Sequence, residues 1–486
     1  METRGFFQFI SSIILYIFIV PIIYILLFVN EVVRFIVSIH LRIKYNGNVV
    51  LVSDGADGFW AFKHPARTRM GIIALMLDKS IPIETLQKNF NDSVFQLKSP
   101  NGKRIYSKLE NILVLKCGYA CWQKDERFDL NNHFRSFSTS KVYNKLEMQQ
   151  EIAQMAQDMS EERPQWEFIS VPRFVDSDDD SEKSVFIFRF QHAYMDGFSY
   201  ITMMNHVTSG FTYYFHPLEF RIPFWKNFLF YTNAVIFGPY AAVLLLFNVF
   251  DNSWPQRESG MSNKTVLNYS WTKSMDLGVL KTLRKRLNHP TIPTILENAF
   301  VSAALEVLGR ERVPKKVSNA EVVALLPYPN ISPQNRLTVF IYKMNSLQPA
   351  LERIKTSKTE SWKGLTGPWI PLFSLIKRLM GRQSMPFQPF LMGRGSMPLL
   401  FSNVPVSKTK FSFMNTAEVV DVLAFTPQQT NTGITLCSRV YENSVKMTAV
   451  ALSTWLTEKE LEDIIERIPQ LLDEWVDELG SEDEAV

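Results

Sequence analysis

Cysteine is scarce in this chain: Cys117, Cys121 and Cys437 are the only three among 486 residues. Three cysteines cannot form a framework of disulfides, and no cluster of histidines accompanies them to complete a zinc site. We therefore expect no metal site, and a reducing compartment suits the chain best.

A large excess of charge is also missing. The 52 Lys and Arg nearly balance the 48 Asp and Glu, which leaves a net charge of +4 without a domain-sized basic stripe. Nucleic acid is therefore not expected as a partner. Apolar residues make up 46% of the 486 residues, so most of the chain should fold as globular protein. Because this length exceeds one typical core, two domains with additional segments are expected.

What is abundant is aromatic and apolar side chains, concentrated in a few stretches. Residues 6–30, from Phe6 to Asn30, carry no charge, and about 20 apolar residues suffice to cross a bilayer as a helix. The stretch predicts a transmembrane helix, because it is too long for a signal peptide and no cleavage site follows. Pro21 should kink this helix. Residues 32–41 should continue it into the interface as an amphipathic stretch.

The charges beside this helix predict its orientation. Arg34, Arg42 and Lys44 follow it, whereas Arg4 and the terminal amine precede it. Because positively charged flanks stay on the cytosolic side, we expect the body of the protein to face the cytosol.

A second apolar stretch runs from Phe228 to Phe250. Gly238 and Pro239 divide it into halves that are each too short to span a membrane. We therefore expect a membrane-dipping hairpin or a pair of interfacial helices; a second full span is the alternative. Residues 362–380 mix Trp, Phe and Leu with Lys377 and Arg378, which fits a segment on a membrane surface as well as a packed loop.

The stretch 184–200, SVFIFRFQHAYMDGFSY, is dense in aromatic and β-branched residues up to His192. It predicts a buried strand, then a turn at Gly197, then a helix. One interpretation makes His192 a general base, since the pKa of imidazole lies near working pH. The other makes it a structural histidine, with Asp196 as the cap of the following helix.

Elsewhere, hydrophobic periodicity and turn residues predict alternating elements. Residues 54–62 should form a turn, residues 176–182 a solvated acidic loop, and residues 481–486 a disordered acidic tail. His133 is more typical of a structural histidine than of a catalytic one. We expect strands at 70–77, 111–119, 166–171, 265–270, 321–326, 399–406, 433–439 and 446–452, and helices at 82–95, 146–159, 276–287, 293–308 and from a cap at Thr457.

Several separated motifs together resemble the wax ester synthase/diacylglycerol acyltransferase family. The segment 192–197 is similar to its HHxxxDG motif, with Gln191 in place of the first histidine. The other similar segments are 122–135 (its W..D..FDL..H.R), 163–167 (its RPLWE, with Gln165 for Leu) and 402–405 (its SNVP). Two departures occur: Pro293-Thr294-Ile295 replaces the family's VND, and no Gly-Pro follows SNVP.

The resemblance implies an α/β fold of two chloramphenicol-acetyltransferase-like domains, each a mixed sheet flanked by helices, with a central tunnel. The expected order is an N-terminal transmembrane anchor (1–43), a first acyltransferase domain (44–220), an apolar membrane-associated segment (221–262), a second acyltransferase domain (263–480) and the tail (481–486).

The resemblance also implies an O-acyltransferase that uses acyl-CoA as co-substrate, without a bound cofactor. It would acylate a long-chain alcohol or diacylglycerol at the membrane of the endoplasmic reticulum or a lipid droplet. His192 would be the general base, Asp196 would orient the loop, and Asn403, Ser402 and Gln191 are candidates for binding the substrate or the oxyanion. The alternatives are a silent lipid-binding or scaffold protein, or a transferase for a sterol or an amine.

Overall fold

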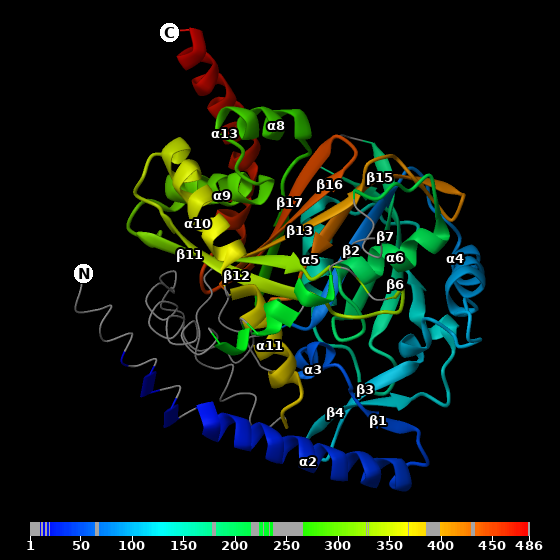
Figure 1. Cartoon of the computed structure of the whole chain (residues 1–486). Helices are drawn as coiled ribbons and strands as arrows, with labels where there is room; N and C mark the ends of the chain where they lie inside the picture. Colours follow the sequence, from blue (N-terminus) through cyan, green and yellow to red (C-terminus); the bar gives the residue numbers. More distant parts are fainter. Residues whose placement is uncertain are drawn as a thin grey trace.

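The computed structural model describes residues 10, 13–14, 17–18, 20–63, 68–176, 181–214, 223–226, 228–232, 234–236, 266–326, 328, 330–367, 369–384, 399–428 and 433–484. Two mixed sheets lie side by side and form the two halves of the body (Figure 1). Phe6, Gly238, Pro239, Phe250 and most of the segment 221–262 lie outside the described residues, so the predicted membrane-dipping hairpin does too.

The first sheet has the order β5-β6-β7-β2-β15-β14-β8. Its strands are β2 (Met70–Leu77), β5 (Phe134–Ser136), β6 (Trp166–Val175), β7 (Glu182–Gln191), β8 (Thr208–Ser209), β14 (Ser412–Phe413) and β15 (Ala417–Phe425). The last two come from the part of the chain that the sequence assigns to the second domain. They belong to the first sheet because β15 pairs antiparallel with β2, so the division at 263 is wrong for these strands.

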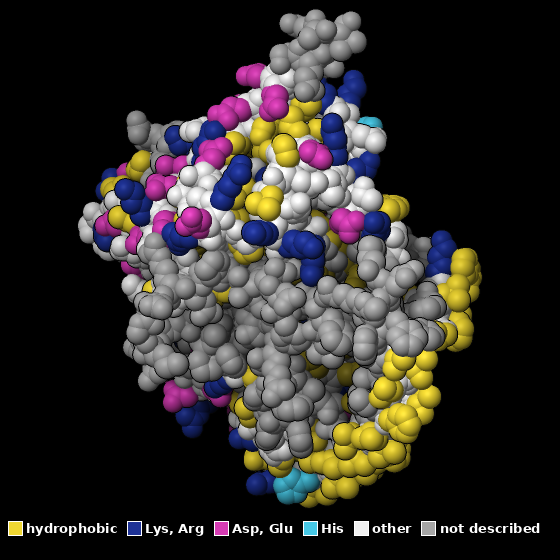
Figure 2. Space-filling view, turned by 90° about the vertical axis from the view of Figure 1, so that its left-hand side faces the viewer, with side chains coloured by type: hydrophobic (Ala, Val, Ile, Leu, Met, Phe, Trp, Pro, Cys, Tyr) yellow, Lys and Arg dark blue, Asp and Glu magenta, His cyan; other side chains and the backbone are white. Residues whose placement is uncertain are grey.

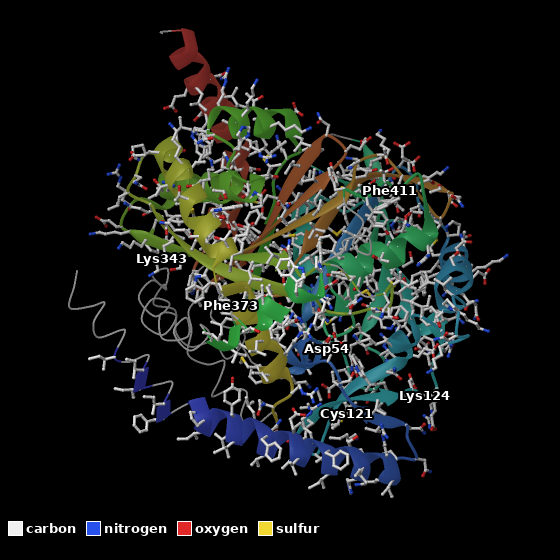
Figure 3. All side chains as sticks on the ribbon, viewed as in Figure 1. Asp54, Cys121, Lys124, Lys343, Phe373 and Phe411 are labelled. Atoms are coloured by element: carbon white, nitrogen blue, oxygen red, sulfur yellow. The ribbon has the colours of Figure 1, made fainter. Side chains whose placement is uncertain are left out.

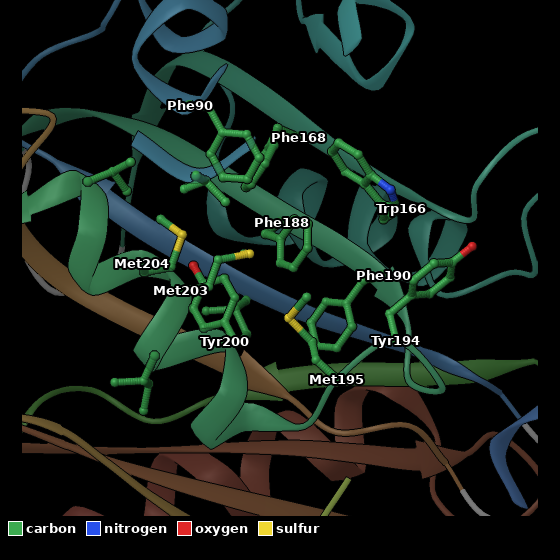
Figure 4. Packing of buried hydrophobic residues seen from close by; sticks show 14 of the residues in the cluster. Phe90, Trp166, Phe168, Phe188, Phe190, Tyr194, Met195, Tyr200, Met203 and Met204 are labelled. Atoms are coloured by element: carbon green, nitrogen blue, oxygen red, sulfur yellow. The ribbon is translucent and has the colours of Figure 1, made fainter. Parts of the chain in front are cut away.

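Alternation along β7 explains why this strand is central. Phe186, Phe188 and Phe190 point to one face and join a cluster of aromatic side chains with Phe90 and Trp166 (Figure 4). The residues between them point to the other face and pack against helix α5 (Lys145–Met155). Apolar residues on both faces are what a strand in the middle of a sheet needs.

The second sheet has the order β10-β17-β16-β13-β11-β12, and β9 pairs with β17. Its strands are β9 (Leu267–Trp271), β10 (Met275–Asp276), β11 (Lys316–Ala324), β12 (Leu337–Asn345), β13 (Leu399–Ser407), β16 (Ile434–Tyr441) and β17 (Ser444–Leu452). Helices α8 (Leu277–Arg286), α9 (Ile292–Leu308), α10 (Ala350–Thr366) and α13 (Glu458–Glu484) contribute to its core. The strands predicted at 433–439 and 446–452 are β16 and β17, which pair antiparallel.

A smaller layer lies at the base of the molecule (Figure 1). A sheet of order β1-β4-β3 is built from β1 (Val49–Leu51), β3 (Asn111–Lys116) and β4 (Tyr119–Lys124). Helix α2 (Val20–Lys44) packs on it, through Leu41 against Val49 and Cys121 (Figure 3). Among the described residues, Tyr24–Lys44 is the one segment long and apolar enough to cross a membrane.

Helices α3 (Gly55–Ala61) and α11 (Trp369–Gly381) approach each other backbone to backbone. A Cβ added at Gly55 would lie 1.8 Å from the Arg378 carbonyl oxygen, and one at Gly58 would lie 2.2 Å from that of Gly381. The glycines allow this close approach. Residues 55–61 form a helix, so the turn predicted for this stretch is wrong. Burial of Ile370 and Leu372 shows that α11 packs within the body, although Trp362 on α10 is exposed.

Buried ion pairs connect the two halves. Lys446 on β17 lies 3.1 Å from Asp176, which follows β6, and 2.8 Å from Asp421 on β15. Arg439 also pairs with Asp421. The acidic loop was predicted to be solvated, but Asp176 is buried because its carboxylate neutralises a buried lysine of the other sheet.

The remaining elements differ from the predictions mainly at their ends. The helix predicted at 82–95 is α4 (Ile83–Phe90) followed by a π turn (Asn91–Phe95), and α6 (Gly197–Met204) follows β7 as predicted. Strand β13 continues through Pro405. The tail predicted to be disordered is helical up to Glu484, because α13 continues without interruption.

Candidate functional site

His192 lies directly after β7, five residues before α6 begins. Its backbone N–H donates to the Arg69 carbonyl at 2.8 Å, and the residue is only 5% exposed. The imidazole stacks on the indole of Trp60, with ring centroids 4.0 Å apart and planes inclined by 23°. Trp60 belongs to α3, so the tight packing of α3 on α11 fixes the plane of the histidine ring.

Asn335, just before β12, determines which nitrogen of His192 is protonated. Its Nδ2 donates to Asp57 Oδ1 and to the His192 carbonyl, both at 2.8 Å. A carboxylate and a carbonyl only accept, so the amide oxygen faces the ring, where it lies 2.9 Å from His192 Nδ1. Nδ1 must then carry the proton and donate to Oδ1. Nε2 is left as the basic nitrogen.

The carboxylate of Asp57 is held by Lys108, whose Nζ lies 2.7 Å from Asp57 Oδ2. Burial raises the pKa of Asp57, and Lys108 and the Asn335 amide oppose this shift. Lys108 itself lies over the ring of Trp122, 5.1 Å from its centroid. A chain of contacts therefore runs from Lys108 through Asp57 and Asn335 to His192.

Asp196 caps α6, as one interpretation of the sequence predicted. Its Oδ1 accepts from the Ser199 N–H at 2.9 Å, and its Oδ2 accepts from the Tyr328 hydroxyl at 2.7 Å and the Arg336 N–H at 2.8 Å. Burial raises the pKa of this carboxyl, although these hydrogen bonds oppose the shift. Asp196 thus ties the turn after His192 to the segment that carries Asn335.

A buried cation accompanies the two carboxylates. Lys377 of α11 donates to the Leu337 carbonyl at 3.0 Å. Burial lowers the pKa of Lys377 to about 8, and the charges of Asp196 and Asp57 oppose that shift. A lysine with this pKa is still largely charged at neutral pH, which helps to keep both carboxylates ionised.

His192 opens onto a cavity of about 60 Å³ between the two sheets. Gly197, Ser402 and Asn403 line it as well, so four predicted site residues meet there although two of them come from β13. The Ser438 hydroxyl donates to Asn403 Oδ1 at 2.8 Å, which leaves Nδ2 as the end of that amide that can donate. The full lining is Gly71, Ile72, Ile73, Phe190, His192, Gly197, Phe198, Val322, Ala324, Leu337, Ser402, Asn403, Val404, Ala424, Phe425, Thr426 and Pro427.

A second, apolar cavity of about 30 Å³ adjoins the first, and Ile73, Val404 and Ala424 line both. Its other walls come from β2, α6 and the segment around β14 and β15, and they include Phe411 (Figure 3). The lining is almost wholly hydrocarbon, since Tyr200 and Thr208 are the only residues in it with a polar side-chain atom.

Two predicted site residues have other roles than expected. Gln191 is not part of the cavity wall: its Nε2 donates to the Trp60 carbonyl at 2.8 Å, and its Oε1 accepts from the Ala193 N–H. It therefore positions Trp60. Gly197 is not needed for a tight turn, because its φ is not positive and an added Cβ would meet Val404 at an ordinary 3.9 Å. Its lack of a side chain keeps the cavity open instead.

The contacts of His133 are structural, as predicted. Its Nδ1 lies 2.7 Å from the Trp166 carbonyl oxygen, and its ring stacks on that indole at 4.1 Å. Burial lowers the pKa of His133 to about 4. Sequence reasoning missed Trp60, Asp57 and Asn335; the only local signal was the acidic, aromatic stretch 54–62, since nothing near Asn335 marks it as a site residue.

The segment around His192 is similar to a known protein family. Residues 68–211 match the family model of the wax ester synthase/diacylglycerol acyltransferase catalytic domain. This segment is less than half of the chain, but it includes β2, β7, His192 and α6. No curated protein sequence matches the chain.

Solved structures share the whole fold. The wax ester synthase/diacylglycerol acyltransferase from Marinobacter aquaeolei VT8 is similar with a TM-score of 0.57 and 14% identity, over 88% of this chain and 99% of that chain. The trichothecene 15-O-acetyltransferase from Fusarium sporotrichioides gives 0.60 and 11%, over 87% and 95%. A cyclization-docking bidomain from Sorangium cellulosum gives 0.54 and 11%, over 87% and 83%.

Identities this low show the fold alone, whereas the family model identifies the segment around His192. Residues 68–211 are therefore similar to the catalytic domain of the wax ester synthase/diacylglycerol acyltransferase family, and the chain shares the two-domain fold of these solved structures.

Proposed function

We propose that this protein transfers a long-chain acyl group from acyl-CoA to the hydroxyl of a fatty alcohol or a diacylglycerol, with His192 as the general base. The observation that carries the proposal is the tautomer of His192, whose Nδ1 is bound to Asn335. Nε2 is then the basic nitrogen of a histidine that lines a cavity between the two sheets.

The reaction needs a base because an alcohol is a poor nucleophile. His192 Nε2 takes the hydroxyl proton as the alcohol oxygen bonds to the thioester carbonyl carbon. The carbon–sulfur bond then breaks, and the same proton passes to the departing sulfur, so that an ester and free CoA leave. No acyl-enzyme is required. Asn403 Nδ2 is our candidate donor to the oxygen that gains negative charge.

The apolar cavity beside His192 suits the acyl chain. Its hydrocarbon walls have few polar groups that would lose contact with water when an acyl chain binds. Burial of each methylene of the chain contributes about 0.8 kcal/mol to binding. At about 60 and 30 Å³ the two cavities hold only a few waters. A long acyl chain must therefore displace side chains that line the second cavity, such as those of Met204 and Phe411.

The membrane is the proposed source of both lipids, and the body is proposed to face the cytosol at the endoplasmic reticulum or a lipid droplet. Exposed Phe224 and Trp225 precede the second apolar stretch, and exposed Phe228 begins it; these side chains support its contact with lipid. Asn330, exposed and followed by Ile-Ser, gives a check: glycosylation there would place the body in the lumen and contradict this orientation.

The test is ester formation by membranes that contain the full chain, supplied with labelled acyl-CoA and either a long-chain alcohol or a diacylglycerol. His192→Ala should lower kcat by about 10²- to 10⁴-fold. His289→Asn, at an exposed histidine after α8, is the matched control and should leave the rate unchanged.

Other outcomes have a definite meaning. Wild-type rates in His192→Ala would remove the base assignment. Bound lipid without turnover in the wild-type protein would favour the silent binding protein, and products from a sterol or an amine alone would change the acceptor.

A further inference from the structure

Three polar side chains in the middle of helix α2, those of Asn30, Glu31 and Arg34, bond to the body, whereas His40, Arg42 and Lys44 near its C-terminal end are exposed. The Arg34 guanidinium donates to the Val52 carbonyl at 3.0 Å and to the Arg382 carbonyl at 3.1 Å, and Arg34 is only 6% exposed. Asn30 donates to the same Arg382 carbonyl and accepts from the Tyr119 hydroxyl at 3.0 Å. Glu31 pairs with the Arg382 side chain. These three side chains are therefore bound by groups of the folded body.

The outward face of α2 is apolar over almost its whole length, and in Figure 2 its side chains form a yellow band along the lower right edge. Exposure reaches 71% for Phe28 and 74% for Ile43. A helix on a water-facing surface has the opposite arrangement, with apolar residues inward. The exposed residues are Ile22, Tyr24, Ile25, Leu26, Phe28, Val29, Val32, Val33, Phe35, Ile36, Ile39 and Ile43.

The C-terminal end of this apolar face is bordered by cations. Lys44 at the end of α2 and Lys116 at the end of β3 both lie over the ring of Tyr45, each within 6 Å of its centroid. Apolar side chains bordered by lysines are typical of a helix that lies at the interface of an anionic membrane.

We propose that α2 lies in the plane of the membrane surface, with its outward face in the lipid from Ile22 to Ile43, and that it docks the base of the body onto anionic phospholipid. A helix that crossed the bilayer and left it at Asn30 would expose residues 32–43 to water over about 18 Å of its length, at 1.5 Å per residue. Six large apolar side chains of this stretch, Val32, Val33, Phe35, Ile36, Ile39 and Ile43, would then be exposed to water. The in-plane arrangement buries these side chains together with those before them. The proposed in-plane helix replaces the transmembrane helix that the sequence predicts to end at Asn30.

The test compares the depths of three labels on one face. Val29, Ile36 and Ile43 are all exposed and lie two turns apart. Each is replaced by cysteine in the full chain with Cys117→Ser, because Cys117 is the exposed native thiol. Spin labels are measured in vesicles of phosphatidylcholine and phosphatidylserine by their collision with oxygen and with a water-soluble nickel complex.

Equal, shallow depths at the three positions are expected. A change of about 10 Å from one label to the next would show a crossing helix and overturn the proposal. Labels open to the nickel complex at all three positions would show a water-facing helix. Labels shielded from both reagents would show cover by a second copy or by another segment of this chain. Either result also overturns it.

A binding measurement adds a second, independent criterion. Phe35→Gln with Ile39→Gln should weaken vesicle binding by about 100-fold or more, because two large apolar side chains leave the lipid without a change in charge. Leu347→Gln, at an exposed residue of the second domain, is the matched control and should bind as the wild type. The double variant should keep its rate on detergent-dispersed substrates, whereas His192→Ala should lose it there, which separates this inference from the proposed catalysis.

Discussion

The Asn335 amide holds the Nδ1 side of His192, and replacing it with leucine should slow acyl transfer while both domains remain folded. Leucine has a similar volume but no polar atom. The change removes the acceptor of the Nδ1 proton at 2.9 Å and one donor to Asp57 at 2.8 Å. The imidazole can then adopt the other tautomer, in which Nε2 carries the proton and cannot act as a base.

The expected magnitude follows from these hydrogen bonds. A neutral hydrogen bond contributes about 1 kcal/mol and one to a charged group up to about 3 kcal/mol. The bond to Nδ1 gains charge as His192 takes the proton of the alcohol. The loss in the transition state should therefore be about 1.4 to 3 kcal/mol, which is roughly 10- to 100-fold in kcat. This loss is smaller than that of His192→Ala.

The assay is steady-state ester formation with acyl-CoA and a long-chain alcohol, together with urea unfolding. KM should change less than kcat, because Asn335 contacts the base from the side away from the cavity. Gln334→Leu is the control: this side chain bonds the Asn330 carbonyl at 2.9 Å, and the backbone contacts of the segment remain. A folded Asn335→Leu protein with a kcat within twofold of the wild type would refute the tautomer argument.

Three further predictions concern stability and packing. Burial raises the pKa of Glu321 from 4.5 to about 7; the fold keeps a proton that the unfolded chain releases, so stability should fall by about 3 kcal/mol as pH rises through that window. Glu321→Gln should reduce this trend in urea titrations at pH 5 and 8, and the rest should come from the neighbouring Glu297, whose pKa burial also raises. Lys446→Met leaves two buried carboxylates without this cation and should cost about 3–5 kcal/mol in urea unfolding, whereas Arg467→Met at the surface should cost about 1 kcal/mol or less. Gly58→Ala puts a methyl 2.2 Å from the Gly381 carbonyl oxygen; it should destabilise the protein by about 1–3 kcal/mol and lower kcat, and an unchanged melting temperature and rate would show that α3 can shift freely.

Elements that depend on neighbours in the chain were predictable. Helix α13 begins with the predicted cap, in which the Thr457 N–H donates to Glu460 at 2.9 Å and the Glu460 N–H donates back to the Thr457 hydroxyl at 3.2 Å. Strand β7, with apolar residues on both faces, was identified for the same reason. Caps and residue periodicity act over a few positions, so a single segment contains their whole signal.

Other elements depended on distant partners, and there the predictions failed. Asp176 lies in a run of acidic residues that is typical of a solvated loop, and its burial depends on distant partners, Lys446 and the Trp271 indole, which bind its carboxylate. The glycines of residues 54–62 favour a turn when only their neighbours are considered. In the fold they belong to helix α3, and they are needed because α11, far along the chain, passes so close that no side chain would fit.

The sequence by itself determined that His192 follows a buried strand, that Asp196 can cap the next helix, and that the N-terminal helix is apolar. Only the tertiary structure decided which nitrogen of His192 is basic, because that depends on Asn335, 143 residues away. It also decided which face of α2 is outward, since Arg34 is satisfied by carbonyls of the folded body. Hydrogen bonds and desolvation act on whichever groups the fold brings together, and no local pattern records that choice.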